Sequence, residues 1–140
     1  MRAWEILLRN VTVLQSVLEE AEPALSALEL DKKQLFILST VEDYPFPADL
    51  AQALSIPKPS ITFLVKKLEE AGYLRRQGEE GDLRRYRLTI TPSGKKARDK
   101  GAEAVSGIFG RRLSRLSAAD RATLSRILEQ LQTRPIDRRY

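Results

Sequence analysis

The stretch from residue 59 to residue 90 constrains the fold more than any other part of the chain. Residues 59–71 carry apolar side chains at the spacing of one helical face, namely Ile61, Leu64, Val65 and Leu68. Gly72 follows as a C-terminal stop. Residues 73–77 and 82–90 then show the pattern of two strands around a turn between Gly78 and Gly81. The stretch therefore predicts a helix that leads directly into a β-hairpin.

Two further helices are expected before this unit. Asp31 begins one of them, with Gln34 three residues later, which is the spacing of a capping box. Residues 47–54, PADLAQAL, form the other, between the proline-rich breaks DYPFP and SIPKP. Two helices joined by a tight turn and followed by a hairpin describe a winged helix-turn-helix.

A long helix is predicted at the start of the chain, over residues 3–21. It carries a heptad seam made of Trp4, Leu7, Val11, Leu14, Leu18 and Ala21. A second apolar row lies beside the seam and consists of Ile6, Val13 and Val17. A helix that is apolar on two sides must bury both, so we expect one side to face a second copy of the chain. Burial of both sides within one domain is the alternative, and Pro23 is expected to end or kink the helix.

Two more helices are predicted after the hairpin. Thr91 caps the first, which begins at Pro92 and runs to about Leu116. Ser117 caps the second, whose apolar stripe consists of Leu124, Ile127, Leu128 and Leu131. We therefore predict a mainly α fold with a small β-hairpin, in a single domain over residues 1–140. Residues 31–91 would form the winged helix-turn-helix, flanked by helical segments at 3–30 and 92–133.

Composition excludes several kinds of reactive site. The chain has no cysteine and no histidine, which removes disulfides, thiol chemistry, Cys- or His-ligated metals and Ser-His or Cys-His dyads. The adjacent pairs Glu69-Glu70 and Glu79-Glu80 fall on elements expected to be exposed, where neighbouring carboxylates make poor acid–base pairs. We therefore expect no enzyme activity, no metal and no cofactor.

Membrane attachment and secretion are not expected either. No apolar run approaches the roughly 20 residues that a membrane span needs. The start, MRAWEILLRN, has neither the apolar region nor the cleavage site of a secretory signal. We therefore expect a cytoplasmic protein without a membrane partner.

The net charge of +5 is distributed unevenly along the chain. It is −5 over residues 1–57, +6 over residues 58–98 and +4 over residues 99–140. A basic central segment in a mildly basic chain favours a polyanionic partner such as nucleic acid.

The second face of the helix at 59–71 carries groups that suit a DNA major groove. Ser60 and Thr62 supply small hydroxyls, and Phe63 lies nearly opposite the core side, where it suits a base contact or a stack. An isolated exposed phenylalanine is the alternative. Lys66 and Lys67 suit phosphates, although two glutamates in the last turn partly offset them, and simple solvation of the helix is their other role.

The arginines of the hairpin differ in the face that they occupy. One parity of the second strand faces a core and consists of Tyr86, Leu88 and Ile90, whereas Arg85 has the other parity. Arg84 has the core parity but lies at the tip, where an arginine suits a minor groove. Asp82 can pair with its guanidinium and hold it in position. An ordinary surface hairpin with an exposed ion pair is the alternative.

The segments PADLAQALSIPKPSITFLVKKLEEAGYLRR and GDLRRYRLTITPSGKKA resemble the core of the MarR family of transcription regulators. The matching motifs are Leu50-Ala51, Ser60 to Thr62, Leu68-Glu69 with Gly72, Asp82-Leu83-Arg84, and Ile90-Thr91-Pro92-Ser93-Gly94. The long flanking helices match as well. The chain departs from the usual family residues at Phe63, Lys66, Leu83 and Ile90.

The resemblance implies a ligand-responsive repressor that binds a palindromic operator in double-stranded DNA as a homodimer. A small effector would alter the spacing of its two DNA-reading lobes. Base contacts would come from Ser60, Thr62 and Phe63, and phosphate contacts from Lys58, Lys66, Lys67, Arg75 and Arg85. Arg84, oriented by Asp82, would enter the minor groove. The segments 3–30 and 92–133 would be dimerisation helices, with Trp4, Leu7, Val11, Leu124 and Leu128 at the interface.

A winged-helix module that binds only other proteins is the alternative function. Such a module should show an apolar patch over residues 58–87 in place of a basic ridge.

Overall fold

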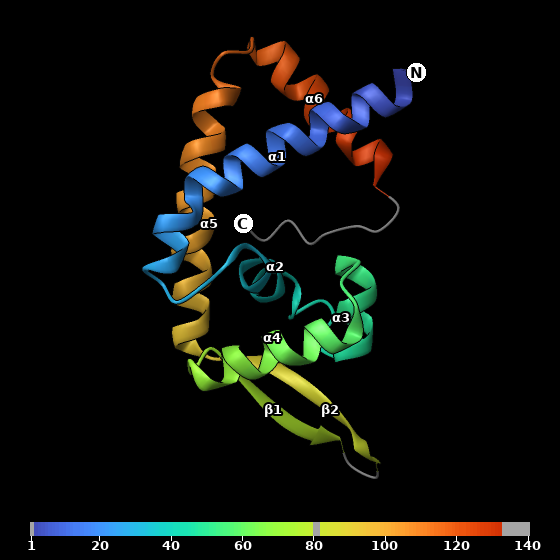
Figure 1. Cartoon of the computed structure of the whole chain (residues 1–140), viewed down its shortest axis with the longest axis vertical. Helices are drawn as coiled ribbons and strands as arrows, with labels where there is room; N and C mark the ends of the chain where they lie inside the picture. The colour runs from blue at the N-terminus through green and yellow to red at the C-terminus, as the bar shows by residue number, and fades with distance from the viewer. Residues whose placement is uncertain (1, 80–81, 133–140) are drawn as a thin grey trace.

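The computed structural model describes residues 2–79 and 82–132, without the side chains of residues 79 and 82–84. The described elements are α1 (Arg2–Ser26), α2 (Lys32–Thr40), α3 (Pro47–Leu54), α4 (Lys58–Glu70), β1 (Leu74–Glu79), β2 (Asp82–Ile90), α5 (Pro92–Leu113) and α6 (Ala118–Leu131). Figure 1 shows α5 running between two ends of the molecule, with α2, α3, α4 and the hairpin at one end and α6 at the other. The predicted mainly α fold with a winged helix-turn-helix is confirmed.

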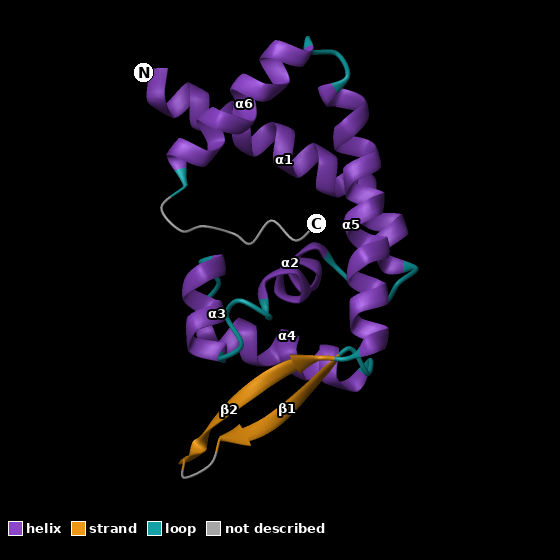
Figure 2. Ribbon diagram, turned by 180° about the vertical axis from the view of Figure 1, so that it is seen from behind, coloured by secondary structure: helices purple, strands orange, loops and turns teal. Residues whose placement is uncertain are grey.

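The core of the hairpin end is built from the predicted apolar faces. The four residues predicted to lie on the inner side of α4 are all buried, namely Ile61, Leu64, Val65 and Leu68. β1 and β2 pair antiparallel, with Leu74 opposite Ile90 and Arg76 opposite Leu88. Leu88 and Ile90 are buried against the helices. The hairpin base therefore belongs to the core, whereas Figure 2 shows the rest of the hairpin projecting beyond α4.

Local capping signals define the helix ends. Asp31 and Gln34 form the predicted capping box, in which each side chain accepts a hydrogen bond from the backbone N–H of the other residue at 2.8 Å. Oγ1 of Thr91 accepts from the N–H of Gly94 at 3.0 Å, and Oγ of Ser117 accepts from the N–H of Asp120 at 3.1 Å. All three predicted caps are confirmed.

The hairpin is tied to α5 through one compact joint. Gly72 has a φ of +80°, which lets the chain turn from α4 into β1. Its carbonyl oxygen accepts hydrogen bonds from Oγ1 of Thr91 at 2.6 Å and from Oγ of Ser93 at 2.9 Å. The carbonyl oxygen of Tyr73 accepts a third from the N–H of Thr91 at 3.0 Å. Gly94 lies so close that an added Cβ would stand 2.2 Å from that same oxygen, so backbone contact requires glycine there.

Tyr73 also links this joint to the turn after α1. Its hydroxyl donates a hydrogen bond to the carbonyl oxygen of Leu28 at 2.7 Å. Burial of the ring, and secondarily the charge of Glu29, raise the pKa of Tyr73 above its ordinary value of 10.0. The neutral phenol is therefore the form that the folded chain favours.

α1 is longer than predicted. It continues through Pro23 to Ser26, so the predicted end near residue 21 is wrong. The other predicted effect of Pro23, a kink in the helix, stays a prediction. The interior proline costs about 3 kcal/mol, since it removes a backbone hydrogen bond. The residues beyond it continue the buried stripe, however, and Leu25 is only 1% exposed. Burying a leucine side chain contributes about 1.5–3 kcal/mol, which offsets most of that cost.

α5 is shorter than predicted. It ends at Leu113 and not near Leu116. The N–H groups of Arg115 and Leu116 each bond the carbonyl three residues earlier, which tightens the chain into a turn before the Ser117 cap. The cap of α6 thus sets where α5 can end.

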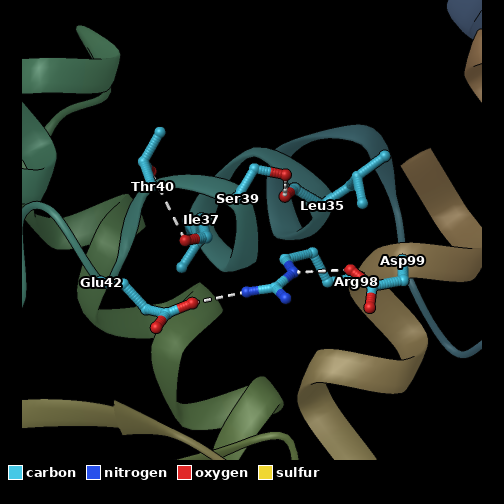
Figure 3. Close-up of polar contacts among 7 residues, drawn as sticks. All are labelled: Leu35, Ile37, Ser39, Thr40, Glu42, Arg98 and Asp99. Carbon is cyan, nitrogen blue, oxygen red and sulfur yellow. Dashed lines mark hydrogen bonds and ion pairs between the residues drawn. The ribbon is translucent and has the colours of Figure 1, made fainter. Parts of the chain in front are cut away.

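Arg98 fastens α5 to the end of α2 (Figure 3). Its Nη1 donates to Oε1 of Glu42 at 2.6 Å, and its Nε donates to Oδ1 of Asp99 at 3.0 Å. The arginine is buried, while the side chains of Glu42 and Asp99 are 33% and 62% exposed. A buried guanidinium needs such partners, so this cluster fixes the orientation of α5 against the helix-turn-helix.

The flanking helices expose much of their apolar surface in the single chain. The seam residues Trp4, Leu7, Val11 and Leu14 are 37–55% exposed, and Ile6 and Val13 of the second row are also exposed. On α6, Leu124 is half-buried, and Ile127, Leu128 and Leu131 are exposed. Only the second half of α1 is covered, because Val17, Leu18 and Ala21 pack into the core. Burial of both sides of α1 within one chain, the alternative above, is therefore not what the structure shows.

Candidate nucleic-acid interface

The outer face of α4 presents an aromatic ring and a cation together. Phe63 is 58% exposed, although it belongs to a helix whose inner face is completely covered. Nζ of Lys67 lies 4.8 Å from the centre of its ring, one helical turn further on. The two side chains predicted to contact a base and a phosphate therefore form one surface feature.

Two small hydroxyls lie at the start of the same helix. Ser60 is half-buried and Thr62 is exposed. Oγ1 of Thr62 donates to the carbonyl oxygen of Lys58 at 3.1 Å, and its lone pairs can still accept a hydrogen bond. Both residues are in the first turns of α4, where the helix dipole favours an anion.

Exposed cations surround this face on three elements. Those predicted to contact phosphates are all exposed: Lys58, Lys66 and Lys67 on α4, Arg75 on β1 and Arg85 on β2. Glu69, which was expected to offset the lysines, instead binds Arg76 of β1, with Nη2 and Oε1 2.8 Å apart. That hydrogen bond is the main reason why the pKa of Arg76 lies above its ordinary value. The lysines of α4 therefore keep their charge available to a ligand.

The wing-tip residues fall partly outside the described structure. Asp82 begins β2 and pairs with Glu79 in the ladder, across an irregularity after Gly78. The side chains of Asp82 and Arg84 lie outside the described part of the chain, so their predicted pairing and minor-groove role stay predictions.

A phenylalanine that no sequence motif singles out lies beside the hairpin. Phe46 immediately precedes α3, and its ring centre is 3.9 Å from Cζ of Arg85 and 5.7 Å from Cζ of Arg87. A groove of about 300 Å³ opens between Phe46, Lys58, Thr62 and Arg85. The sequence gives no sign of this contact, because Phe46 looks like part of a proline-rich break.

Neither a metal site nor a membrane span is found in the described structure. Among residues 2–79 and 82–132, no three acidic side chains are grouped so as to hold a metal ion. Within the same ranges no helix has the length and apolar character needed to cross a bilayer. The surface offers aromatic, hydroxyl and cationic groups, which suit binding of an extended anion.

Comparison with known proteins gives a consistent result. A family model described as MarR family matches residues 31–85, which span α2 to the start of β2. A Thauera aromatica protein named for transcriptional regulation of the hcr operon is 38% identical over 82 residues, covering 59% of this chain and 49% of that protein. The repressor Rv2887 of Mycobacterium tuberculosis is 28% identical over 114 residues, covering 80% and 82%. The chain thus spans about half the length of the first relative and about four fifths of the second.

Solved structures agree with these relatives. Rv2887 in complex with salicylic acid superposes with a TM-score of 0.70 at 27% identity, covering 90% of this chain and 93% of that one. The S. aureus MepR–DNA complex superposes with a TM-score of 0.73 at 20% identity, covering 91% and 95%. At that identity the second likeness shows the fold alone.

Proposed function

We propose that this chain, which belongs to the MarR family, is a sequence-specific double-stranded DNA-binding regulator. It acts as a homodimer, as a repressor on a palindromic operator, and responds to a small-molecule effector. The exposed face of α4 carries the proposal, because it combines Phe63, two hydroxyls and exposed lysines beside a hairpin that bears exposed arginines. A DNA major groove admits such a helix, and the cations around it suit the backbone phosphates.

Individual residues are assigned the roles that their chemistry and place in the fold suit. Ser60, Thr62 and Phe63 contact base edges, and the exposed cations Lys58, Lys66, Lys67, Arg75 and Arg85 hold phosphates. Arg84 enters the minor groove with Asp82 orienting it. Figure 1 supports this division, because the hairpin projects beyond α4 as a separate arm.

The exposed apolar rows on α1 and α6 support the homodimer. A monomer seldom leaves so much clustered apolar surface in water, and a two-fold dimer buries the same patch from both copies. The interface is formed by Trp4, Leu7 and Val11 of α1 with Leu124 and Leu128 of α6. The effector part of the proposal is supported by Rv2887, whose solved structure is a complex with salicylic acid.

A protein-binding module fits the surface less well. Among the described side chains of residues 58–87, Phe63 is the single large apolar residue that is exposed. The rest of that outer surface is mostly cationic, which favours a polyanion over an apolar partner. The relatives are named as transcription regulators, a class of protein without enzymatic activity.

Selection of bound fragments from genomic DNA, followed by anisotropy titrations on a selected duplex, tests the function. Affinity should fall about 10³-fold or more between 50 and 200 mM salt. Arg84→Ala should weaken the selected duplex much more than a random one. Lys67→Ala should weaken both and reduce the salt slope by about one.

Arg126→Ala is the matched control, since Arg126 is exposed on α6, at the far end from the hairpin. It should leave the affinity and the salt slope unchanged. A duplex affinity that does not respond to salt would refute the proposed function.

A further inference from the structure

Phe46 occupies a position for which its own side chain is poorly suited. It is the N-cap of α3 and makes no side-chain capping hydrogen bond, whereas Ser, Thr, Asp and Asn are strongly preferred there. Its backbone is extended, with φ −103° and ψ 136°, as expected for a residue before a proline. Helix formation thus gives no reason for an aromatic ring at this point, and the reason must lie in what the ring contacts.

The ring contacts the arginine face of β2. Arg85 and Arg87 are two residues apart on that strand and therefore share a face. The Cζ of Arg85 is 3.9 Å from the ring centre, which is the distance of a stacked guanidinium, and that of Arg87 is 5.7 Å away. The ring of Phe46 therefore lies against the guanidinium groups of both Arg85 and Arg87.

The backbone beside the ring is fixed to the same strand. The carbonyl oxygen of Pro45 accepts a hydrogen bond from the N–H of Leu88 at 2.7 Å. Leu88 is buried and belongs to the core side of β2, and Phe46 lies between Pro45 and Pro47, whose φ angles are fixed by their rings. The backbone next to Phe46 is therefore held beside the strand that carries the arginines.

The two stacked arginines differ from the arginine on the neighbouring strand. Arg76 also stacks on an aromatic ring, that of Tyr86 at 4.1 Å, but Glu69 already neutralises it. Within the described side chains, neither Arg85 nor Arg87 lies within ion-pair distance of a carboxylate. Both are exposed, and Arg85 borders the groove that also contains Lys58. Stacking orients the guanidinium groups of Arg85 and Arg87, and their positive charges stay available to an anion.

We infer that Phe46 is a positioning residue that holds Arg85 and Arg87 toward the DNA backbone beside the hairpin. This inference rests on the proposed function, since the anion it invokes is a phosphate of duplex DNA. An arginine held in place loses less side-chain freedom on binding, so the affinity gained is an entropic one. Sparing part of the cost of ordering one arginine side chain corresponds to about two- to fivefold in affinity.

The test compares Phe46→Leu, which removes the ring, with Phe46→Tyr, which keeps it. Phe46→Leu should bind the selected duplex about two- to fivefold more weakly, and Phe46→Tyr should bind like the wild type. In an Arg85→Ala, Arg87→Ala background, Phe46→Leu should cause no further loss. Phe36→Leu is the control, because Phe36 is another half-buried phenylalanine, on α2 and outside the groove.

A second readout does not involve DNA. The side-chain protons of Arg85 should show an upfield ring-current shift in nuclear magnetic resonance spectra of the free protein, and Phe46→Leu should abolish it. Phe46→Met serves in place of Phe46→Leu if the leucine variant does not fold, as judged by its thermal unfolding.

The outcomes distinguish the positioning role of Phe46 from the proposed DNA-binding function. Wild-type affinity in Phe46→Leu, or an equal loss in the background without the arginines, overturns the positioning role and leaves the proposed function intact. An equal loss in Phe36→Leu also overturns it. A wild-type chain that binds no duplex overturns both, even if the ring-current shift is present.

Discussion

Replacing Gly94 by alanine tests the joint between the hairpin and α5. The new Cβ would lie 2.2 Å from the carbonyl oxygen of Tyr73 and 2.9 Å from Cγ1 of Ile90, whereas ordinary contacts begin at 3.4 Å. The oxygen cannot simply retreat, because it accepts the hydrogen bond from the N–H of Thr91. Relief therefore requires the start of α5 and the start of β1 to separate by about 1 Å.

The expected loss of stability follows from three contributions. Overpacking of a well-packed site costs about 1–3 kcal/mol. Strain on the hydrogen bond between Thr91 and Tyr73 adds about 0.5–1.5 kcal/mol. The higher helix propensity of alanine returns up to about 1 kcal/mol. Gly94→Ala should thus lower the free energy of unfolding by about 2 kcal/mol.

Gly110 provides a matched control on the same helix. A Cβ added at Gly110 meets no atom of the described chain within 4 Å, so Gly110→Ala should stabilise the chain by about 0.5–1 kcal/mol. Urea titrations followed by far-ultraviolet circular dichroism, at one protein concentration, measure both variants. If Gly94→Ala is as stable as the wild type, or gains as much as Gly110→Ala, the joint is not the close-packed contact described above.

Two further predictions concern polar groups that are buried or half-buried. Tyr73→Phe should lose about 1 kcal/mol of stability at neutral pH with the hydrogen bond to Leu28. Folding raises the pKa of Tyr73, so the contribution of its neutral hydroxyl to stability is complete below about pH 10 and is lost as the pH rises through the folded pKa. The difference in the free energy of unfolding between wild type and variant, measured by urea titration, should therefore shrink at alkaline pH. Glu42→Ala should cost about 1–2 kcal/mol in the same titrations, since it removes a charged partner of the buried Arg98. Asp99→Ala, at a more exposed partner, should cost under about 1 kcal/mol, and equal losses would contradict the asymmetry of the cluster.

Most helix and strand positions could be predicted because their signals are local. The capping box at Asp31, the left-handed Gly72 and the Thr91 cap each act within three residues of the chain, so their consequences are legible in the sequence. The inner face of α4 could be predicted as well, because one helical period fixes which side chains share a face. The order of these elements along the chain then indicated a winged helix-turn-helix.

The errors and omissions arose where distant residues decide the outcome. Pro23 does not end α1, because the burial of Leu25 against other elements outweighs the local cost. Glu69 binds Arg76 on the next element and not the lysines of its own helix. Phe46 acquires its partners only when β2 is placed beside it. Each of these contacts depends on tertiary packing, about which the spacing of residues along the chain carries no information.

The continuous helix α5 has a mechanical consequence. Its 22 residues make a rod about 33 Å long. Ser93 in its first turn bonds Gly72, just before the hairpin, and Arg112 near its last turn bonds Ser16 of α1. Over such a length a tilt of about 5° at one end corresponds to a shift of about 3 Å at the other. The rod therefore works as a lever arm. A small displacement of α1 at one end of α5 would rotate the whole hairpin at the other end.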